Sequence, residues 1–115
     1  MQFYEYDIEC IEKARKLIDA DISSHTTIAA LAMKSGLGES KLKAGFKKFY
    51  GSSPYAYLRQ QRMIKAAGMI LESRKSMKQI AKATGFRHTN NFITAFSAFY
   101  HITPHRYRQQ KLPGK

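Results

Sequence analysis

The stretch TIAALAMKSGL at residues 27–37 is matched by SMKQIAKATGF at residues 76–86, so one pattern occurs twice in the chain, 49 positions apart. Each copy has an apolar pair in its middle and ends on a glycine followed by leucine or phenylalanine. Past the glycine the offset becomes 50, and five further residues correspond. These are Phe46, Phe49, Tyr50, Pro54 and Tyr57, which match Phe96, Phe99, Tyr100, Pro104 and Tyr107. A repeat of this period sets the architecture, because each copy is one supersecondary unit.

Each copy has the composition of a short helix, a tight turn and a longer helix. Thr27 and Ser76 stand where an N-cap hydroxyl is expected, and Gly36 and Gly85 stand where a left-handed residue ends a helix. In the longer segments that follow, leucine and phenylalanine recur at helical spacing. The sequence therefore predicts two helix-turn-helix units.

The whole chain is predicted to be all-α, with seven helices and no strand. Apolar residues recur at helical spacing in the long segments, and polar, glycine or proline breaks separate them. The expected helices lie near residues 7–20, 28–35, 39–50, 54–73, 77–84, 89–100 and 104–108. Asp7 is expected to be the N-cap of the first helix, since a carboxylate there accepts a backbone hydrogen bond.

We predict three parts: a first helix-turn-helix subdomain at residues 1–53, a connecting helix at residues 54–73 and a second subdomain at residues 74–115. At about 1.5 Å per residue the connecting helix would be roughly 30 Å long. Two helices that read one face of B-DNA lie about 34 Å apart, one turn of the duplex. The length of the connecting helix therefore suits two units on successive major grooves.

Charge is distributed unevenly along the chain, whose formal net charge is +12. Residues 1–21 contain six of the eight acidic residues and three basic ones, a net charge of −3. Residues 22–115 contain 17 basic residues and only Glu39 and Glu72 as acids, a net charge of +15. So large a surplus in a small body indicates a polyanionic partner. Nucleic acid is the first candidate, and an anionic membrane surface is the second.

The single cysteine, Cys10, cannot form an internal disulfide, which is consistent with a reducing compartment. It lies beside Ile8 and Ile11, so we expect it to be a small buried apolar residue. No apolar run approaches the roughly 18 residues of a membrane span, and the start, MQFYEYDIE, lacks the pattern of a signal peptide. The expected location is the cytoplasm.

Three spaced motifs make the chain resemble the AraC/XylS family of bacterial transcription regulators over residues 7–109. In the second repeat they are I-A-x-x-x-G-F, F-x-x-x-F-x-x-F-Y and T-P-x-x-Y-R. The resemblance implies sequence-specific binding of double-stranded DNA, with the helices at residues 39–50 and 89–100 in successive major grooves of an asymmetric site. It also implies a role in transcription regulation, with RNA polymerase as a further candidate partner. Many relatives carry a sensing or dimerisation domain before this unit. We expect that domain to be absent from this chain, which would then be a C-terminal part of a longer protein.

In the helix at residues 39–50, Leu42, Phe46 and Phe49 are expected to face the core. The opposite side carries candidate DNA-contacting residues, which also match contact positions of the family. These are Glu39, Ser40, Lys43, Ala44, Lys47 and Lys48. Lys43 suits the O6 and N7 atoms of guanine, and the other two lysines suit phosphate. Lysines on a helix face are often only solvated, but the double motif and the net charge favour DNA contact here.

The helix at residues 89–100 is expected to place Phe92, Phe96 and Phe99 inward. Its outer face has no lysine or arginine, which departs from the family pattern. The candidate contact residues here are Arg87, His88, Thr89, Asn90, Ile93 and Thr94. Asn90 suits adenine and the methyl-bearing side chains suit thymine, while the two residues before the helix would supply positive charge. This helix therefore either reads an AT-rich half-site or binds only weakly, and its isoleucine could also be an ordinary exposed residue.

Two other functions suit a basic helical chain of this kind less well. A module that docks on protein or on an anionic membrane would need apolar side chains on an exposed basic helix face, whereas lysines occupy that face at residues 39–50. An enzyme would need a catalytic constellation, and the sequence shows none. His101 and His105 have the spacing of zinc ligands on one helix, but Pro104 starts a new helix between them. We therefore predict no enzyme, no metal and no cofactor, and we expect Arg62 to order helix packing.

Overall fold

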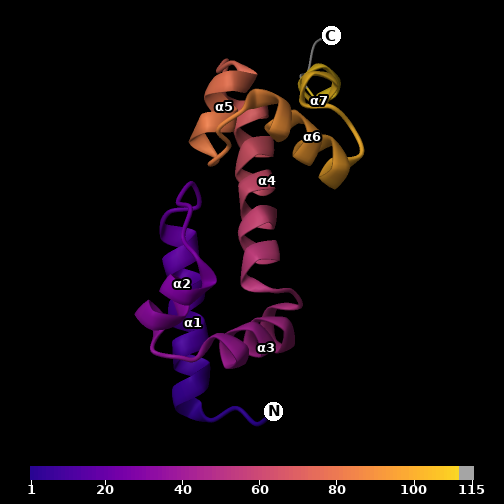
Figure 1. Cartoon of the computed structure of the whole chain (residues 1–115). Coiled ribbons are helices and arrows are strands. Elements are labelled where there is room, and N and C mark those ends of the chain that lie inside the picture. Colours follow the sequence, from indigo (N-terminus) through magenta and orange to yellow (C-terminus); the bar gives the residue numbers. More distant parts are fainter. Residues whose placement is uncertain (112–115) are drawn as a thin grey trace. The chain divides into compact units, whose positions relative to one another are not determined.

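A computed structural model of the chain describes residues 1–111, and this part contains seven α-helices and no strand (Figure 1). The predicted all-α class is therefore confirmed. The helices are α1 (Glu5–Ala20), α2 (Ile28–Ser35), α3 (Glu39–Tyr50), α4 (Pro54–Glu72), α5 (Met77–Ala83), α6 (Thr89–Tyr100) and α7 (Pro104–Lys111). The last four residues of the predicted second subdomain, 112–115, lie outside the described residues. None of the described helices combines the length and the apolar character that crossing a membrane requires.

Contacts between residues divide the chain into two compact units, residues 1–61 and residues 62–115. The first unit holds α1, α2, α3 and the start of α4, and the second holds the rest of α4 with α5, α6 and α7. Each unit therefore contains one copy of the repeat. Because the division falls inside α4, this continuous helix contributes to both units.

The N-cap signals of the repeat act in the same way in both units. The Thr27 hydroxyl accepts a hydrogen bond from Ala30 N at 3.0 Å, and the Ser76 hydroxyl accepts one from Gln79 N at 3.1 Å. Each hydroxyl satisfies a backbone N–H that the first turn of a helix leaves without a partner. The predicted N-caps of α2 and α5 are confirmed.

Gly36 and Gly85 place a left-handed residue in each turn, with φ of +85° and +93°. A residue with a Cβ rarely adopts this conformation, and neither turn has room for one. A Cβ would lie 2.9 Å from the Tyr6 hydroxyl at the first position and 2.9 Å from the Arg62 guanidinium carbon at the second. Arg62 is buried, and its guanidinium carbon lies 6.0 Å from the centre of the Phe86 ring. Its predicted role in helix packing agrees with this position.

The core of the first unit is formed by residues of α1, α2, α3 and the start of α4. Its buried members are Ile11, Ala14, Ile18, Leu31, Ala32, Leu42, Phe46 and Leu58. At the crossing of α1 and α3 the backbones lie so close that a Cβ on Gly45 would overlap the Ile11 side chain. Cys10 is buried as predicted. The core therefore fixes α3 by its apolar side and leaves the opposite side uncovered.

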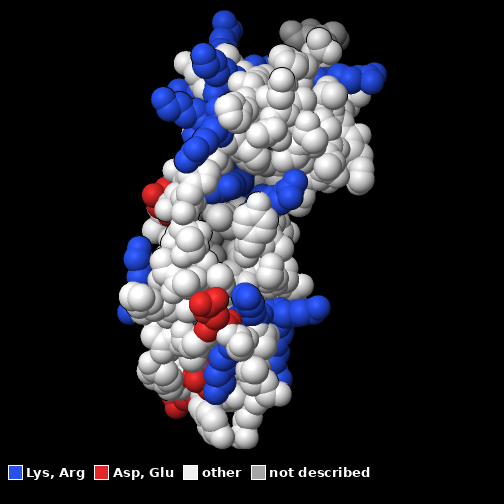
Figure 2. Space-filling view, viewed as in Figure 1, with Lys and Arg blue, Asp and Glu red and all other residues white. Residues whose placement is uncertain are grey.

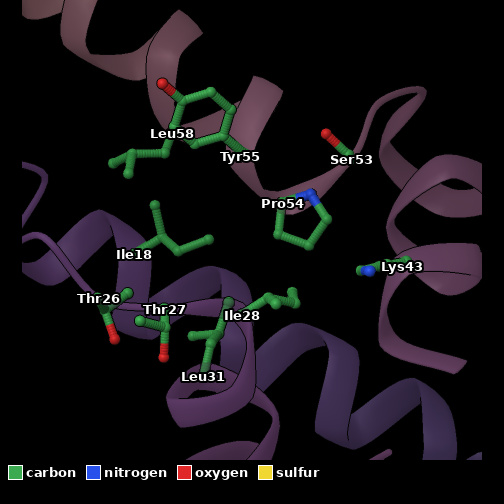
Figure 3. A pocket seen from close by; sticks show the side chains of 10 residues that line it. All are labelled: Ile18, Thr26, Thr27, Ile28, Leu31, Lys43, Ser53, Pro54, Tyr55 and Leu58. Carbon is green, nitrogen blue, oxygen red and sulfur yellow. The ribbon is translucent and has the colours of Figure 1, made fainter. Parts of the chain in front are cut away.

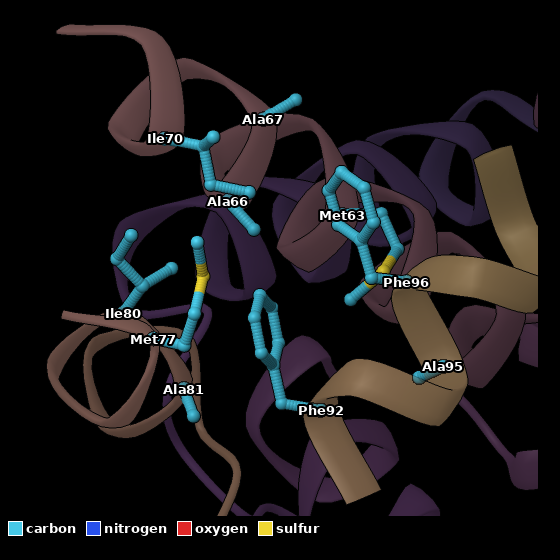
Figure 4. Packing of buried hydrophobic residues seen from close by; sticks show 10 residues of the cluster. All are labelled: Met63, Ala66, Ala67, Ile70, Met77, Ile80, Ala81, Phe92, Ala95 and Phe96. Atoms are coloured by element: carbon cyan, nitrogen blue, oxygen red, sulfur yellow. The ribbon is translucent and has the colours of Figure 1, made fainter. Parts of the chain in front are cut away.

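The core of the second unit joins α4, α5 and α6 (Figure 4). Its members are Met63, Ala66, Ala67, Ile70, Met77, Ile80, Ala81, Phe92, Ala95 and Phe96. The first four form the buried face of α4. From α7, Arg108 donates hydrogen bonds to the backbone oxygens of Ile70, Ser73 and Lys75 at 2.9, 3.3 and 3.0 Å. This arginine satisfies one carbonyl group in the last turn of α4 and two in the segment that follows it, and thereby holds α7 in place.

Two predictions about side-chain placement are wrong. α1 begins at Glu5 with Tyr4 as its N-cap, and Asp7 lies inside the first turn, where its carboxylate accepts from Tyr4 N at 2.9 Å. Phe49 and Phe99, predicted to face the core, are 41% and 40% exposed. Each lies in the last turn of its helix, where its ring is only partly covered.

Candidate nucleic-acid interface

The side of α3 opposite the core is open to solvent. Its exposed residues include five of the six predicted contact residues, and Ala44 is half-buried. The five are Glu39, Ser40, Lys43, Lys47 and Lys48. They lie on a helix whose buried stripe is fixed by Leu42 and Phe46. The predicted face of α3 is thus present as one polar, lysine-bearing surface.

Polar contacts from α1 hold α3 near its start. The Lys41 ammonium pairs with the Asp7 carboxylate at 2.7 Å, and the Asp7 side chain is largely buried. The same ammonium lies 5.3 Å from the centre of the Tyr4 ring. Lys41 lies next to the outward face of α3. Because its side chain is held by Asp7 and Tyr4, the two contacts fix the rotation of α3 about its own axis.

A second polar cluster holds the end of α3. Arg15 Nε of α1 donates to the Tyr50 hydroxyl at 3.3 Å and its guanidinium pairs with Asp19 at 3.0 Å. From α4, the Tyr57 hydroxyl donates to Asp19 at 2.7 Å. α3 is therefore anchored at both ends, and a surface used for recognition gains from such preorganisation.

The Asp7–Lys41 pair predicts a pH dependence for the first unit. The Lys41 ammonium, followed by the hydrogen bond from Tyr4 N, lowers the pKa of Asp7. A carboxyl whose pKa is depressed on folding stabilises the fold above its unfolded pKa of about 3.9, and this contribution is lost as pH falls through the folded pKa. We expect Asp7→Asn to lower the unfolding midpoint temperature at pH 6 and to lower it progressively less as the pH falls below the unfolded pKa. Thermal unfolding at stepped pH measures this difference.

Glu12→Gln is the matched control for Asp7→Asn, because Glu12 is an exposed carboxylate on the same helix. It removes one negative charge without touching Lys41. If the unfolding midpoint temperature falls by the same amount in both variants at pH 6, the decrease comes from net charge, and the Asp7–Lys41 pair does not stabilise the unit.

The lysines of α3 differ in how much the protein itself occupies them. Lys41 is held by Asp7, and the Lys48 ammonium lies 5.9 Å from the centre of the Phe3 ring. Lys43 and Lys47 form no ion pair with any residue in the described range. Two free cations on one exposed helix face suit the acceptors of phosphates and of base edges.

The outward face of α6 is uncharged, as predicted. Asn90 and Thr94 are exposed, and Thr89 is half-buried. Arg87 and His88, just before the helix, are exposed as well. Ile93 differs from the expectation of an outward isoleucine, because it is half-buried and packs against the core of the second unit. Its side chain is therefore only partly available for contact.

Positive charge in the second unit lies largely outside α6. Figure 2 shows Lys and Arg side chains over α3 in the first unit and over the α5 region in the second. Lys78 and Lys82 of α5 are exposed, as are Arg74 and Lys75 in the segment before it. These residues were missed by the sequence analysis, which compared only the longer helix of each repeat. The offset of 49 aligns the α5 lysines with Ala29 and Met33, which are uncharged. A comparison of the two shorter helices would therefore have shown that the second one carries extra positive charge.

A metal-binding cluster does not occur in the part of the chain that the structure covers. Residues 1–111 hold no group of three histidine, cysteine, aspartate or glutamate side chains that could bind a metal ion. His101 and His105 are both exposed. The arrangement of these residues can therefore bind and position a partner through hydrogen bonds and charge.

Known proteins resemble the chain over most of its length. Residues 31–110 match a family described as a helix-turn-helix domain. The regulatory protein PocR of Salmonella typhimurium is 33% identical over 100 residues, which cover 87% of this chain and 33% of PocR. The chain thus spans about a third of that relative.

Solved structures resemble the fold as well. One of them is a transcriptional regulator from Chromobacterium violaceum that is described as having an AraC-type DNA-binding domain. Its TM-score is 0.83 and its sequence identity 25%, and the match covers 92% of this chain and 95% of that chain. The DNA-binding domain of AdpA, solved in complex with a target DNA, has a TM-score of 0.83 and 20% identity, with coverage of 89% and 92%. The second similarity concerns the fold alone.

Proposed function

The chain belongs to the AraC/XylS family of helix-turn-helix transcription regulators, and on that premise we propose that it binds double-stranded DNA sequence-specifically and regulates transcription. Because this family consists of regulators, the chain is not an enzyme. The proposal receives independent support from the charge of +15 on residues 22–115 and from the exposed lysine-bearing face of α3.

One observation carries the mechanism: the same helix-turn-helix frame occurs twice, with unlike outward faces. α3 presents lysines to solvent, whereas α6 presents asparagine and threonine. In helix-turn-helix proteins the second helix of the motif enters the major groove. We infer that α3 and α6 enter successive major grooves and that one chain reads an asymmetric site.

The proposed roles follow from side-chain chemistry. In the first unit Ser40 and Lys43 contact base edges, with guanine suited to the lysine. Glu39, at the start of the same helix, suits the amino group of cytosine, and Ala44 suits a thymine methyl. Lys47 and Lys48 contact phosphates.

In the second unit Asn90 suits adenine, and the methyl groups of Thr89, Ile93 and Thr94 suit thymine. Phosphate contacts there come from outside α6, at Arg87 and His88 and at the α5 lysines Lys78 and Lys82. The first helix of such a motif crosses the DNA backbone, so lysines on α5 are well placed in the sequence for this role. The second half-site is therefore expected to be AT-rich.

Selection of bound sequences from a random DNA pool tests the proposal. We expect one asymmetric site with two unlike halves about one helical turn apart, the second rich in A·T pairs. A palindromic site would contradict the reading of both halves by one chain.

Salt dependence tests the phosphate contacts separately. Five candidate cations, Lys47, Lys48, Lys78, Lys82 and Arg87, would give a slope of log K against log salt of about −4.5, at roughly −0.9 per phosphate. Fluorescence anisotropy of labelled duplex across a salt series measures this slope. A flat response would rule out the electrostatic contacts and with them the proposed interface.

A further inference from the structure

A cavity of about 270 Å³ opens beside the core of the first unit (Figure 3). It lies among the end of α1, the starts of α2 and α4, and α3, so four helices contribute to its walls. At about 30 Å³ per water molecule this volume equals roughly nine waters. A space of this size is just below the lower end of the range for small-molecule sites, about 300 Å³.

The walls of the cavity are mainly apolar. Ile18, Leu31 and Leu58 are among the lining residues, and all three are core residues with little exposed surface. Ile28 adds a half-buried side chain, and the exposed Tyr55 ring lines the same space. Replacing water by an apolar group beside such apolar surface is favourable, because it removes apolar surface from contact with water.

A single charged residue, Lys43, lines the cavity, and no acidic residue lines it. Lys43 is exposed and forms no ion pair with any residue from 1 to 111. Two of the hydroxyls nearby accept hydrogen bonds inside the protein, Thr27 from Ala30 N and Ser53 from Ala56 N, and both are uncharged. The free ammonium is therefore the group that would select the charge of an occupant.

We propose that this cavity binds a small amphipathic carboxylate with a compact aromatic or branched body of about ten non-hydrogen atoms, a ligand smaller than those of the usual range of sites. The body fills the space between Ile18, Leu31 and Leu58, and the carboxylate accepts hydrogen bonds from Lys43 Nζ. A charge-assisted bond of this kind is stronger than a neutral one. Neutral molecules of the same shape therefore bind less tightly.

Occupancy of the cavity has a consequence for DNA binding. A bound carboxylate offsets the positive charge of Lys43 and places a negative charge beside α3, so it lowers the affinity for the polyanionic DNA. This consequence rests on the proposed function, whereas the binding of the carboxylate does not. The cavity thus gives the DNA-binding unit a site at which a metabolite class can act directly.

A titration monitored by methyl NMR tests the site without DNA. The probes are 4-phenylbutyrate, the neutral 4-phenylbutanamide and acetate. We expect 4-phenylbutyrate to shift the methyl resonances of Ile18, Leu31 and Leu58 saturably, the amide to bind at least about ten-fold more weakly, and acetate to shift none of them. Absence of these shifts, or equal affinity for acid and amide, would overturn the proposal.

Two variants complete the test. Lys43→Gln, at an exposed position, is expected to lower the affinity for 4-phenylbutyrate by about ten-fold, as loss of a charged hydrogen bond implies. The affinity for the amide should not change. Thr26→Phe places a ring at the exposed rim of the cavity and is expected to lower the affinity for both the acid and the amide. Unchanged binding would contradict the position assigned to the ligand. Circular dichroism verifies that each variant is folded.

Competition is measured last, with labelled duplex in the presence of saturating 4-phenylbutyrate. We expect the DNA affinity of the parent chain to fall and that of Thr26→Phe to respond less. If the NMR titration succeeds but the chain binds no DNA, the proposed function fails and the carboxylate site stands. If the chain binds DNA and the resonances do not shift, the carboxylate site fails and the proposed function stands.

Discussion

Replacing Lys43 and Lys47 together by glutamine is expected to lower the affinity for the selected DNA site by about 100-fold. Both side chains are exposed on α3 and pair with no acid in the described chain, so each is free to contact DNA. A hydrogen bond to a charged group contributes about 1.5–3 kcal/mol, and about 1.4 kcal/mol corresponds to ten-fold in affinity. We also expect the salt slope to become shallower by between about one and two. Anisotropy titrations at several salt concentrations measure both quantities.

The matched control is the pair Lys13→Gln and Lys16→Gln on α1. These lysines are exposed in the same unit, so the double variant makes the same change of net charge away from α3. It is expected to change the affinity less than about three-fold, since distant exposed charges are screened at physiological salt. An equal loss in both double variants would mean that net charge alone drives binding and that α3 is not the contacting helix.

The fold was predictable because its signals are local. The bounds of α3 and α6 agree with the sequence analysis at both ends, since an apolar stripe marks both helices and the repeat gives them the same length. The N-caps Thr27 and Ser76 each need only a backbone N–H three residues away. The repeat strengthened these predictions, because two copies with the same spacing make a chance pattern improbable.

What the sequence did not predict depends on residues far apart in the chain. Asp7 was expected to cap α1, but it pairs with Lys41, and no local pattern links the two. Phe49 and Phe99 have the correct helical phase for the core, yet nothing packs over the last turn sufficiently to bury them. His101 adopts φ of +61° at the position where the other repeat has a glycine, so composition gave no sign of a left-handed residue there.

The candidate site was predicted better in the first unit than in the second. Helical phase alone placed the lysines of α3 on the exposed face, and the structure has them there. In the second unit the same phase placed Ile93 outward, but a bulky apolar side chain at the edge of a stripe turns toward the core. The α5 lysines were missed because charge was compared only between the longer helices. The cavity beside Lys43 needs four helices in three dimensions, which a sequence pattern cannot supply.

Phe46→Ala and Phe96→Ala are expected to destabilise their own units by about 3–5 kcal/mol each, the usual cost of removing a buried phenylalanine. Both rings are 0% exposed and lie in matching aromatic clusters, 5.0 Å from the Tyr50 ring and 4.7 Å from the Tyr100 ring. A small domain has a total stability of only about 5 kcal/mol or little more. Amide hydrogen exchange should therefore show α5 and α6 losing protection in Phe96→Ala while α2 and α3 retain it, and the reverse pattern in Phe46→Ala.

The repeat supplies the controls at Phe49 and Phe99, which are 41% and 40% exposed. Their replacement by alanine should cost about 1 kcal/mol, since less apolar surface returns to water. If Phe96→Ala removes protection from α2 and α3 as well, the shared helix α4 makes the chain one cooperative unit. If the loss stays in the second unit, the variant keeps only the half-site read by α3. Base changes in the AT-rich half should then no longer affect its affinity, whereas changes in the other half still should.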